Sequence, residues 1–279
     1  MSEKNIIEED CQSQEEEKES KAHKAHMLDV ASSVISIELP CGYVKDGIIH
    51  KNAVLKEMTG VEEDIITSRG DITGRLNLII FNCLVSLGNI TEKAELKQAV
   101  EDMTGPDRLI SLITLRRVTH GDFLDIKEIC PNRECKAEGN HSINLLDVEV
   151  TPMEDSLVRD FEHQLYSGKK VCWHVLNMAD ETWLQSVRKK NKESTMTLNL
   201  MARVDSIDGK KIIRDGKNFR HALSALKKLT AKERGEMRQL FKKHEGSVDT
   251  ETIFECSECG TEWKKEMPIG DASFFFPSV

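Results

Sequence analysis

The sequence predicts an α+β fold made of two pseudo-repeated halves that meet at a zinc-ribbon-like centre. Three observations lead to this prediction. Segments in which β-branched and polar residues alternate, such as SSVISIELP (32–40), are typical of strands. The long apolar stretch RLNLIIFNCLVSLG (75–88) predicts a buried helix. Two close pairs of cysteines each lie at the tip of a predicted strand–turn–strand unit.

The composition limits the class of protein. The chain has 279 residues, of which 39% are hydrophobic and 31% charged, which is enough for one large domain or two ordinary ones. No stretch approaches the ~18 apolar residues of a membrane span. The start, MSEKNIIEED, lacks the apolar core of a secretory signal, so we expect a cytosolic chain. A net charge of −9 disfavours nonspecific binding to nucleic acid.

Residues 1–27 are predicted to be a disordered, charged tail. They are rich in Glu, Lys, Ser and Gln, include the run EEEKES, and contain few apolar residues. Such a segment buries too little apolar surface to offset the entropy lost on ordering. A solvated charged helix is the alternative.

The first repeat is predicted to span residues 28–152. Two apolar runs, 32–40 and 48–58, flank a turn that contains Asp and Gly, which predicts a β-hairpin. Thr59 is a candidate N-cap, because acidic residues follow it at the positive end of a helix. After the helix at 75–88, AELKQAVEDM (94–103) is amphipathic, and Thr104-Gly105-Pro106 opens another helix. Strands are expected at 122–130 and 141–150.

The second repeat, residues 153–270, follows the same order. A strand-like stretch at 169–178 precedes an acidic helix start, and Leu198-Asn199-Leu200 echoes Leu76-Asn77-Leu78. Two amphipathic helices follow, NFRHALSALKKL and AKERGEMRQLFKKH, and then the strand TETIFE, which ends at a cysteine. Matches separated by about 120 residues indicate a duplicated domain unit rather than a solenoid. Chance similarity between two helix-rich stretches is the alternative.

The paired cysteines predict a metal site. Cys130 and Cys135 form a CxxxxC pair, and Cys256 and Cys259 form a CxxC pair. Zn²⁺ is bound tetrahedrally by four thiolates in structural sites, so we expect one structural zinc ion per chain that joins the two halves. Such a closed site leaves no position for substrate. Free thiols, a redox dithiol at Cys256 and Cys259, an iron–sulfur cluster and a metal shared with a partner are the alternatives. The apolar surroundings of Cys83 and Cys172 predict buried core thiols.

No catalytic motif is found in the sequence. It contains no nucleophile elbow, phosphate loop, HExxH or dinucleotide fingerprint, and its histidines lie in unrelated contexts. We therefore expect a protein that is not an enzyme and has no small-molecule substrate. Residues 203–243 contain 13 Lys and Arg against five Asp and Glu. This excess is typical of a solvated face, or of a docking surface for an acidic partner or nucleic acid.

The last segment, residues 271–279, is predicted to be an aromatic tail. It contains three consecutive aromatic residues, Phe274, Phe275 and Phe276, before a proline. Three adjacent side chains cannot all point into one small core, so these residues are candidates for binding a partner. Packing against the chain's own domain is the alternative.

Taken together, these segments resemble a known family. The resemblance covers residues 34–277 and is carried by IELPCGYV, LKEMTGVEED, RRVTHGDFLDI, EGSVDTETIFECSECGTEW and the terminal SFFFP. The pattern is similar to that of the T-even phage baseplate hub assembly chaperones, which belong to contractile-tail phages and related injection systems. Two features depart from the family pattern. The first cysteine pair is CxxxxC instead of the common CxxC, and the charged tail before residue 28 is extra.

The resemblance implies a non-enzymatic role in assembling the baseplate hub of a contractile tail. The protein would act in the cytoplasm of a bacterium with baseplate or hub proteins as partners, and whether it stays in the finished particle does not follow. The alternative is a zinc-ribbon module that binds nucleic acid or takes part in transcription, which the cysteine pairs and the basic stretch also suggest. An enzyme with an unrecognised site is a third possibility.

Overall fold

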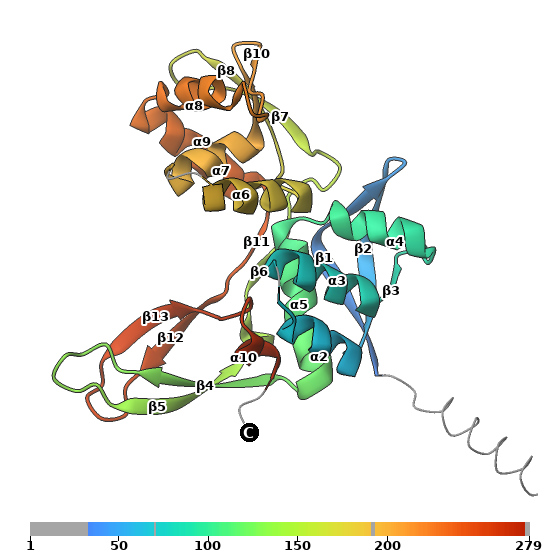
Figure 1. Ribbon diagram of the computed structural model, residues 1–279, viewed down its shortest axis with the longest axis vertical. Coiled ribbons are helices and arrows are strands. Elements are labelled where there is room, and N and C mark those ends of the chain that lie inside the picture. Colours follow the sequence, from blue (N-terminus) through green and yellow to red (C-terminus); the bar gives the residue numbers. More distant parts are fainter. Residues whose placement is uncertain (1–32, 70, 191–192, 277–279) are drawn as a thin grey trace, which may run out of the picture. The chain divides into compact units, whose positions relative to one another are not determined.

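The computed structural model describes residues 33–69, 71–190 and 193–276, and it has a mixed α+β fold, as predicted (Figure 1). The chain divides into two units, Met1–Ser33 and Val34–Val279, and every helix and strand of the described residues belongs to the second. The predicted tail, residues 1–27, lies outside the described residues. Among the helices that the structure describes, none is both long and apolar enough to cross a bilayer.

The first sheet has three antiparallel strands in the order β1 (Val34–Lys45), β2 (Ile48–Lys56) and β3 (Leu84–Leu87). Asp46 and Gly47 form the turn between β1 and β2 with φ angles of 51° and 74°. Positive φ at both central residues is what a two-residue hairpin turn requires, and Asp-Gly tolerates it. The predicted hairpin is therefore confirmed.

Helices pack against this sheet. They are α2 (Gly60–Thr67), α3 (Ile72–Cys83), α4 (Lys93–Glu101) and α5 (Gly105–His120). Thr59 caps α2 in a reciprocal capping box with Glu62, and the Thr104 side chain accepts a hydrogen bond from the first turn of α5, so both predicted helix starts are confirmed. Helix α5 lies against β1 and β2, and α3 packs against α5 (Figure 1). Leu55 of β2 and Leu112 of α5 are fully buried in the same core.

The predicted helix over residues 75–88 is wrong in its second half. The helix ends at Cys83, and the next four residues form β3, in which Leu84 lies opposite Leu55 and Leu87 opposite Ala53. Both leucines of β3 are buried. A continuous apolar run has no periodicity that separates a buried helix from a buried strand, so the sequence pattern could not show this change.

The second half contains a four-stranded antiparallel sheet, in the order β10 (Lys210–Lys211), β9 (Val204–Ile207), β8 (Lys170–His174) and β7 (Asp160–Gln164). Its helices are α6 (Met178–Lys190), α7 (Thr195–Arg203), α8 (Phe219–Lys227) and α9 (Ala231–His244). A separate apolar core forms here around Trp173, Met201 and Leu226. Strand β7, whose residues alternate between exposed and half-buried, was not predicted from the sequence.

The order of elements is alike in the two halves. In each, a β-hairpin is followed by two helices, a short strand that pairs with the hairpin, two more helices and a cysteine-bearing hairpin. The second half has two additional short strands, β10 after β9 and β11 (Ser247–Val248) after α9. The short strands β3 and β9 each begin at the residue after a helix ends. Element order alone does not establish duplication, so the internal repeat stays a prediction.

Each half ends in a two-stranded hairpin. One hairpin consists of β4 (Phe123–Ile129) and β5 (Glu138–Asn144), and the other of β12 (Glu251–Glu255) and β13 (Glu262–Glu266). The two hairpins lie side by side (Figure 1). The short elements η1 (Leu145–Asp147), β6 (Val150–Thr151) and β11 (Ser247–Val248) lie at their base, where β6 pairs with β11.

The aromatic segment near the C-terminus packs against the chain itself. Phe274 and Phe275 belong to the helical turn α10 (Ala272–Phe275), and their side chains are 0% and 1% exposed. The buried guanidinium of Arg116 on α5 donates from Nε to the carbonyl of Phe274 over 2.9 Å. A partner cannot reach rings buried in this way, so the structure corrects the expected partner-binding role for these two residues. Phe276 is half-buried against the same core, and its partner-binding role stays a prediction.

Candidate metal centre

The first pair of cysteines is held by the turn that closes the β4–β5 hairpin. Cys130 follows β4 directly, and its backbone N–H donates to the carbonyl of Ala137 over 2.9 Å. The carbonyl of Asn132 accepts from the backbone N–H groups of Cys135 and Lys136. These bonds close the wider CxxxxC turn, so the two thiols lie on the same side of the hairpin tip.

The second pair of cysteines is held by the turn between β12 and β13. The N–H of Cys256 donates to the carbonyl of Thr261 over 3.0 Å, and the carbonyl of Cys256 accepts from Gly260 over 2.8 Å. Gly260 has a φ of 68°, a left-handed conformation that favours glycine. The glycine after the CxxC motif thus allows the turn that brings Cys259 back beside Cys256.

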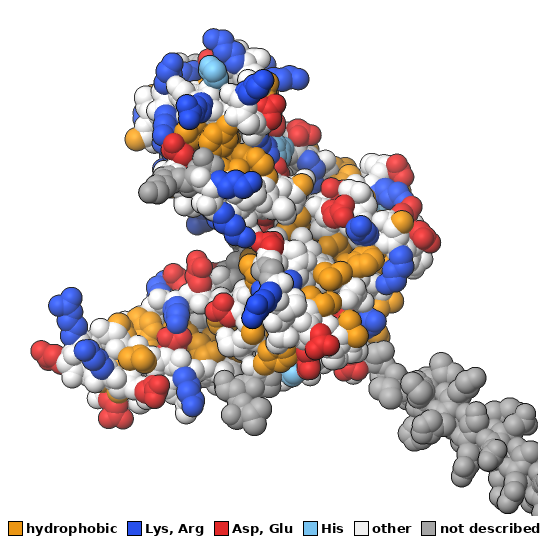
Figure 2. Space-filling view, viewed as in Figure 1, with side chains coloured by type: hydrophobic (Ala, Val, Ile, Leu, Met, Phe, Trp, Pro, Cys, Tyr) orange, Lys and Arg blue, Asp and Glu red, His pale blue; other side chains and the backbone are white. Residues whose placement is uncertain are grey.

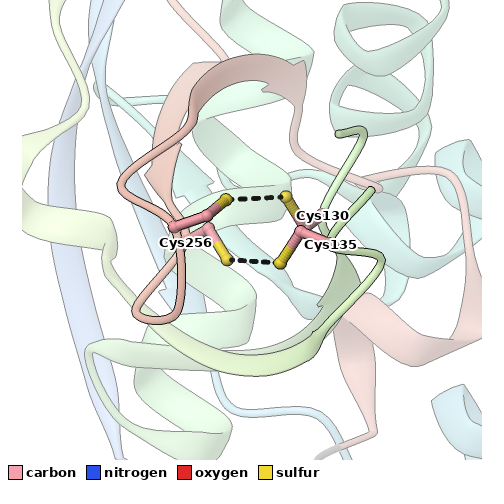
Figure 3. Close-up of side chains that lie close together, drawn as sticks. Cys130, Cys135 and Cys256 are labelled. Carbon is pink, nitrogen blue, oxygen red and sulfur yellow. Dashed lines mark hydrogen bonds between the residues drawn. The ribbon is translucent and has the colours of Figure 1, made fainter. Parts of the chain in front are cut away.

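The two turns bring all four thiols together (Figure 3). The Sγ atoms lie within 4.8 Å of one another, and two distances that join the turns, Cys130–Cys259 and Cys135–Cys256, are both 3.7 Å. A tetrahedron of sulfurs at the Zn–S distance of about 2.3 Å has edges of about 3.8 Å. The donor set and its spacing therefore fit a tetrahedral Zn²⁺ ion, and the predicted convergence of the four cysteines is confirmed.

Polar groups around the cluster stabilise negative charge on one sulfur. The hydroxyl of Thr261 lies 3.1 Å from Cys259 Sγ, and the amide nitrogen of Asn132 lies 3.8 Å from the same sulfur. The hydrogen bonds from Thr261 lower the pKa of Cys259 to about 6. A backbone hydrogen bond from Ala137 lowers the pKa of Cys135, but desolvation and the neighbouring cysteines outweigh it and raise that pKa to about 12. Binding of a metal would therefore displace protons from the cluster.

Aromatic and charged contacts join the hairpins below the cysteines. The ring of His141 on β5 packs edge-on against Phe254 and Trp263, with centroid distances of 5.1 and 5.7 Å. Lys265 on β13 donates to Glu128 on β4 over 2.6 Å. These contacts hold both hairpins in the geometry that the cysteine cluster needs.

The structure also places the cysteines outside the cluster. Cys83 is buried, as predicted, whereas the prediction is wrong for Cys172, which is half-exposed on β8 near Glu162. Its strand neighbours Val171 and Trp173 point into the core, so period-two alternation turns Cys172 outward. Asn132 and Thr261 were not among the predicted site residues. Asn132 lies inside the CxxxxC turn, and Thr261 lies two residues after the CxxC pair. These positions were the sequence signal that could have identified them as neighbours of the cluster.

A second group of charged side chains surrounds His174. Its Nδ1 lies 2.8 Å from a carboxylate oxygen of Asp205, and its Nε2 lies 3.1 Å from Asp180, which also pairs with Arg214. Burial opposes the charged imidazolium, but the hydrogen bonds to both carboxylates outweigh it and raise the pKa of His174 to about 9. A guanidinium nitrogen of Arg214 also lies 3.1 Å from His174 Nε2, so this nitrogen faces both a carboxylate and a cation. With both ring nitrogens in contact with charged groups, His174 joins β8, β9 and α6.

Comparison with known proteins adds no relative. No protein-family model, no curated protein and no solved structure matches the chain.

Proposed function

We propose that the four cysteines bind one structural zinc ion in a non-enzymatic assembly factor for the baseplate hub of a contractile tail or a related injection machine. The single observation that carries the metal assignment is the convergence of the four sulfurs within 4.8 Å of one another, with two distances of 3.7 Å between the turns. Four thiolates fill the coordination sphere of Zn²⁺, which leaves no position for water or substrate. The ion then has a structural role, because it joins two hairpins that are far apart in the sequence.

The assembly role rests on the resemblance of residues 34–277 to the baseplate hub assembly chaperones and is supported by the surface of the hairpins. Phe123 and Ile129 on β4 and Ile253 on β12 are 60%, 62% and 64% exposed. Exposed apolar side chains on the two hairpins are available for contact with a partner protein. Metal-joined hairpins would present them on a rigid support, which lowers the entropy lost on binding.

The zinc content of purified variants tests the metal assignment. We expect one zinc per chain in the parent protein by native mass spectrometry, and loss of zinc with a lower melting temperature in Cys130→Ser and Cys256→Ser, because metal binding adds to the free energy of folding. Cys172→Ser is the matched control, since it removes a half-exposed thiol outside the cluster. Full zinc and an unchanged melting temperature in both cluster variants would refute the site.

Co-purification tests the assembly role. The tagged full chain is expressed together with the proteins encoded beside its gene, and bound partners are identified by mass spectrometry. We expect a hub or baseplate protein to be retained, and Phe123→Ser, Ile129→Ser and Ile253→Ser to reduce its recovery while zinc stays bound. Recovery of the zinc-loaded protein without any tail protein would contradict the role while leaving the metal site intact.

A further inference from the structure

A groove runs between the β9–β10 hairpin and one face of α8. Its volume is about 480 Å³. On the helix side it is lined by His221, Ala222, Ala225 and Lys228, which recur at the three- and four-residue spacing of a single helix face. On the other side lie β10 and the residues that follow it. The groove therefore follows the helix over two turns and has the length of a short peptide segment.

The floor of this groove is apolar. Ile212, Ala222 and Leu229 line it and belong to the second core, where each is less than 10% exposed. Ile213 also lines the groove and is 45% exposed. An apolar floor continuous with a core, with an exposed isoleucine beside it, favours an occupant that carries apolar side chains.

The rim of the groove is basic. Lys210, Lys211 and Lys228 line it, are exposed, and make no ion pair with any residue that the structure describes. Lys169, in contrast, is paired with Glu233, and Asp208 accepts a hydrogen bond from the backbone of Lys170. Figure 2 shows Lys and Arg side chains gathered over this part of the surface. Three free ammonium groups around an apolar floor fit an occupant with carboxylates.

The lining favours a peptide over nucleic acid. Of the residues that line the groove, His221 carries the one ring, and no Phe, Tyr or Trp is among them, so the groove lacks the row of rings on which successive single-stranded bases stack. A peptide that alternates apolar and acidic side chains meets both the floor and the rim.

We propose that this groove docks an acidic peptide segment of a partner protein, with apolar side chains on the Ile212–Leu229 floor and carboxylates on Lys210, Lys211 and Lys228. The proposal rests on the proposed assembly role, because it names the chemistry by which a partner would be held. The groove proposal does not involve the metal centre, so either the groove proposal or the metal assignment can fail without the other.

Peptide selection tests the groove directly. A random peptide display library is selected on the immobilised full chain and then counter-selected on the Lys210→Glu, Lys211→Glu, Lys228→Glu variant. The matched control reverses three exposed lysines that do not line the groove, Lys190, Lys242 and Lys243, with the same change in net charge. The affinity of an enriched peptide is then measured by fluorescence anisotropy at several salt concentrations.

We expect enriched peptides rich in Asp and Glu with interspersed apolar residues. Their affinity should fall at least about tenfold in the groove variant, stay within about twofold in the control, and decrease with salt. Enrichment of peptides without acidic residues, equal binding by both variants, or no enrichment would overturn the proposal. Loss of oligonucleotide binding in the groove variant, without any peptide ligand, would assign the groove to nucleic acid instead. Co-purification of the hub protein is measured on the same variants, so that failure of the groove proposal is distinguished from failure of the proposed assembly role.

Discussion

Replacing His174 with glutamine should remove much of the pH dependence of stability between pH 7 and pH 10. The imidazole of His174 lies between Asp180 and Asp205, and its side chain is 19% exposed. A guanidinium nitrogen of Arg214, which pairs with Asp180, lies 3.1 Å from Nε2 of this imidazole. Glutamine can still donate a hydrogen bond to one carboxylate, but it carries no charge and does not titrate. The variant therefore separates the charge of the imidazolium from its packing.

The magnitude follows from the raised pKa. The pKa of His174 rises from 6.5 to about 9 in the folded chain, and a tenfold change in proton affinity corresponds to about 1.4 kcal/mol. Because the folded-state pKa is raised, the stabilisation is fully present below pH 6.5, where it is about 3 kcal/mol, and is lost as the pH rises through about 9. About 2.5 kcal/mol remains at pH 7 and almost none at pH 10.

Urea unfolding at pH 7 and pH 10 measures this difference. The parent chain should lose about 2 kcal/mol more between these values than His174→Gln loses. His163→Gln is the control, because His163 contacts a single carboxylate and is 37% exposed. Equal losses in the parent and the His174 variant, or an NMR titration of His174 with a midpoint near 6.5, would refute the reasoning.

Four other substitutions test the packing and capping of the fold. Phe274→Ala should lower the free energy of unfolding by about 3–5 kcal/mol because the ring is fully buried, whereas the half-buried Phe276→Ala should cost less; equal costs in urea unfolding would contradict the observed packing. Arg116→Met should cost at least about 3 kcal/mol, because the carbonyls of Gly121, Phe123 and Phe274 lose their donor; a cost below about 1 kcal/mol would show that water replaces it. Burial raises the pKa of Glu233, but hydrogen bonds from Lys169, Ser167 and Thr230 outweigh it and lower that pKa to about 2. The stabilisation that Glu233 provides is present above pH 4.5 and is lost as the pH falls toward 2. Glu233→Gln should therefore lose less free energy of unfolding than the parent chain over this pH range, and an equal loss would contradict this.

Local sequence signals predicted much of the fold. Asp46-Gly47 identified the first hairpin because only a few residue types accept its positive φ angles. Thr59 and Thr104 identified two helix starts because their hydroxyls bond to backbone N–H groups within the next turn. The predicted helix over the AKERGEMRQLFKKH segment matches α9, which begins after its own threonine cap.

Other features depend on contacts that local patterns do not contain. The strand β3 forms because Leu84 and Leu87 reach β2, and the apolar run that contains them has the same pattern as a buried helix. The burial of Phe274 depends on Arg116, which is 158 residues away in the sequence. His174 gains two carboxylate partners only where β9 and α6 bring Asp205 and Asp180 to it.

The sequence by itself determined the donor set of the candidate metal centre, because two close cysteine pairs in turns supply four soft ligands whatever surrounds them. Only the tertiary structure decided that Cys130 lies opposite Cys259 and Cys135 opposite Cys256, at 3.7 Å in each case. The tertiary structure also decided which lysines make no ion pair with the described residues. The basic composition of residues 203–243 does not show that Lys210, Lys211 and Lys228 surround one apolar groove. The physical reason is that ligand type and charge belong to single residues, whereas convergence arises from the packing of elements that are distant in the chain.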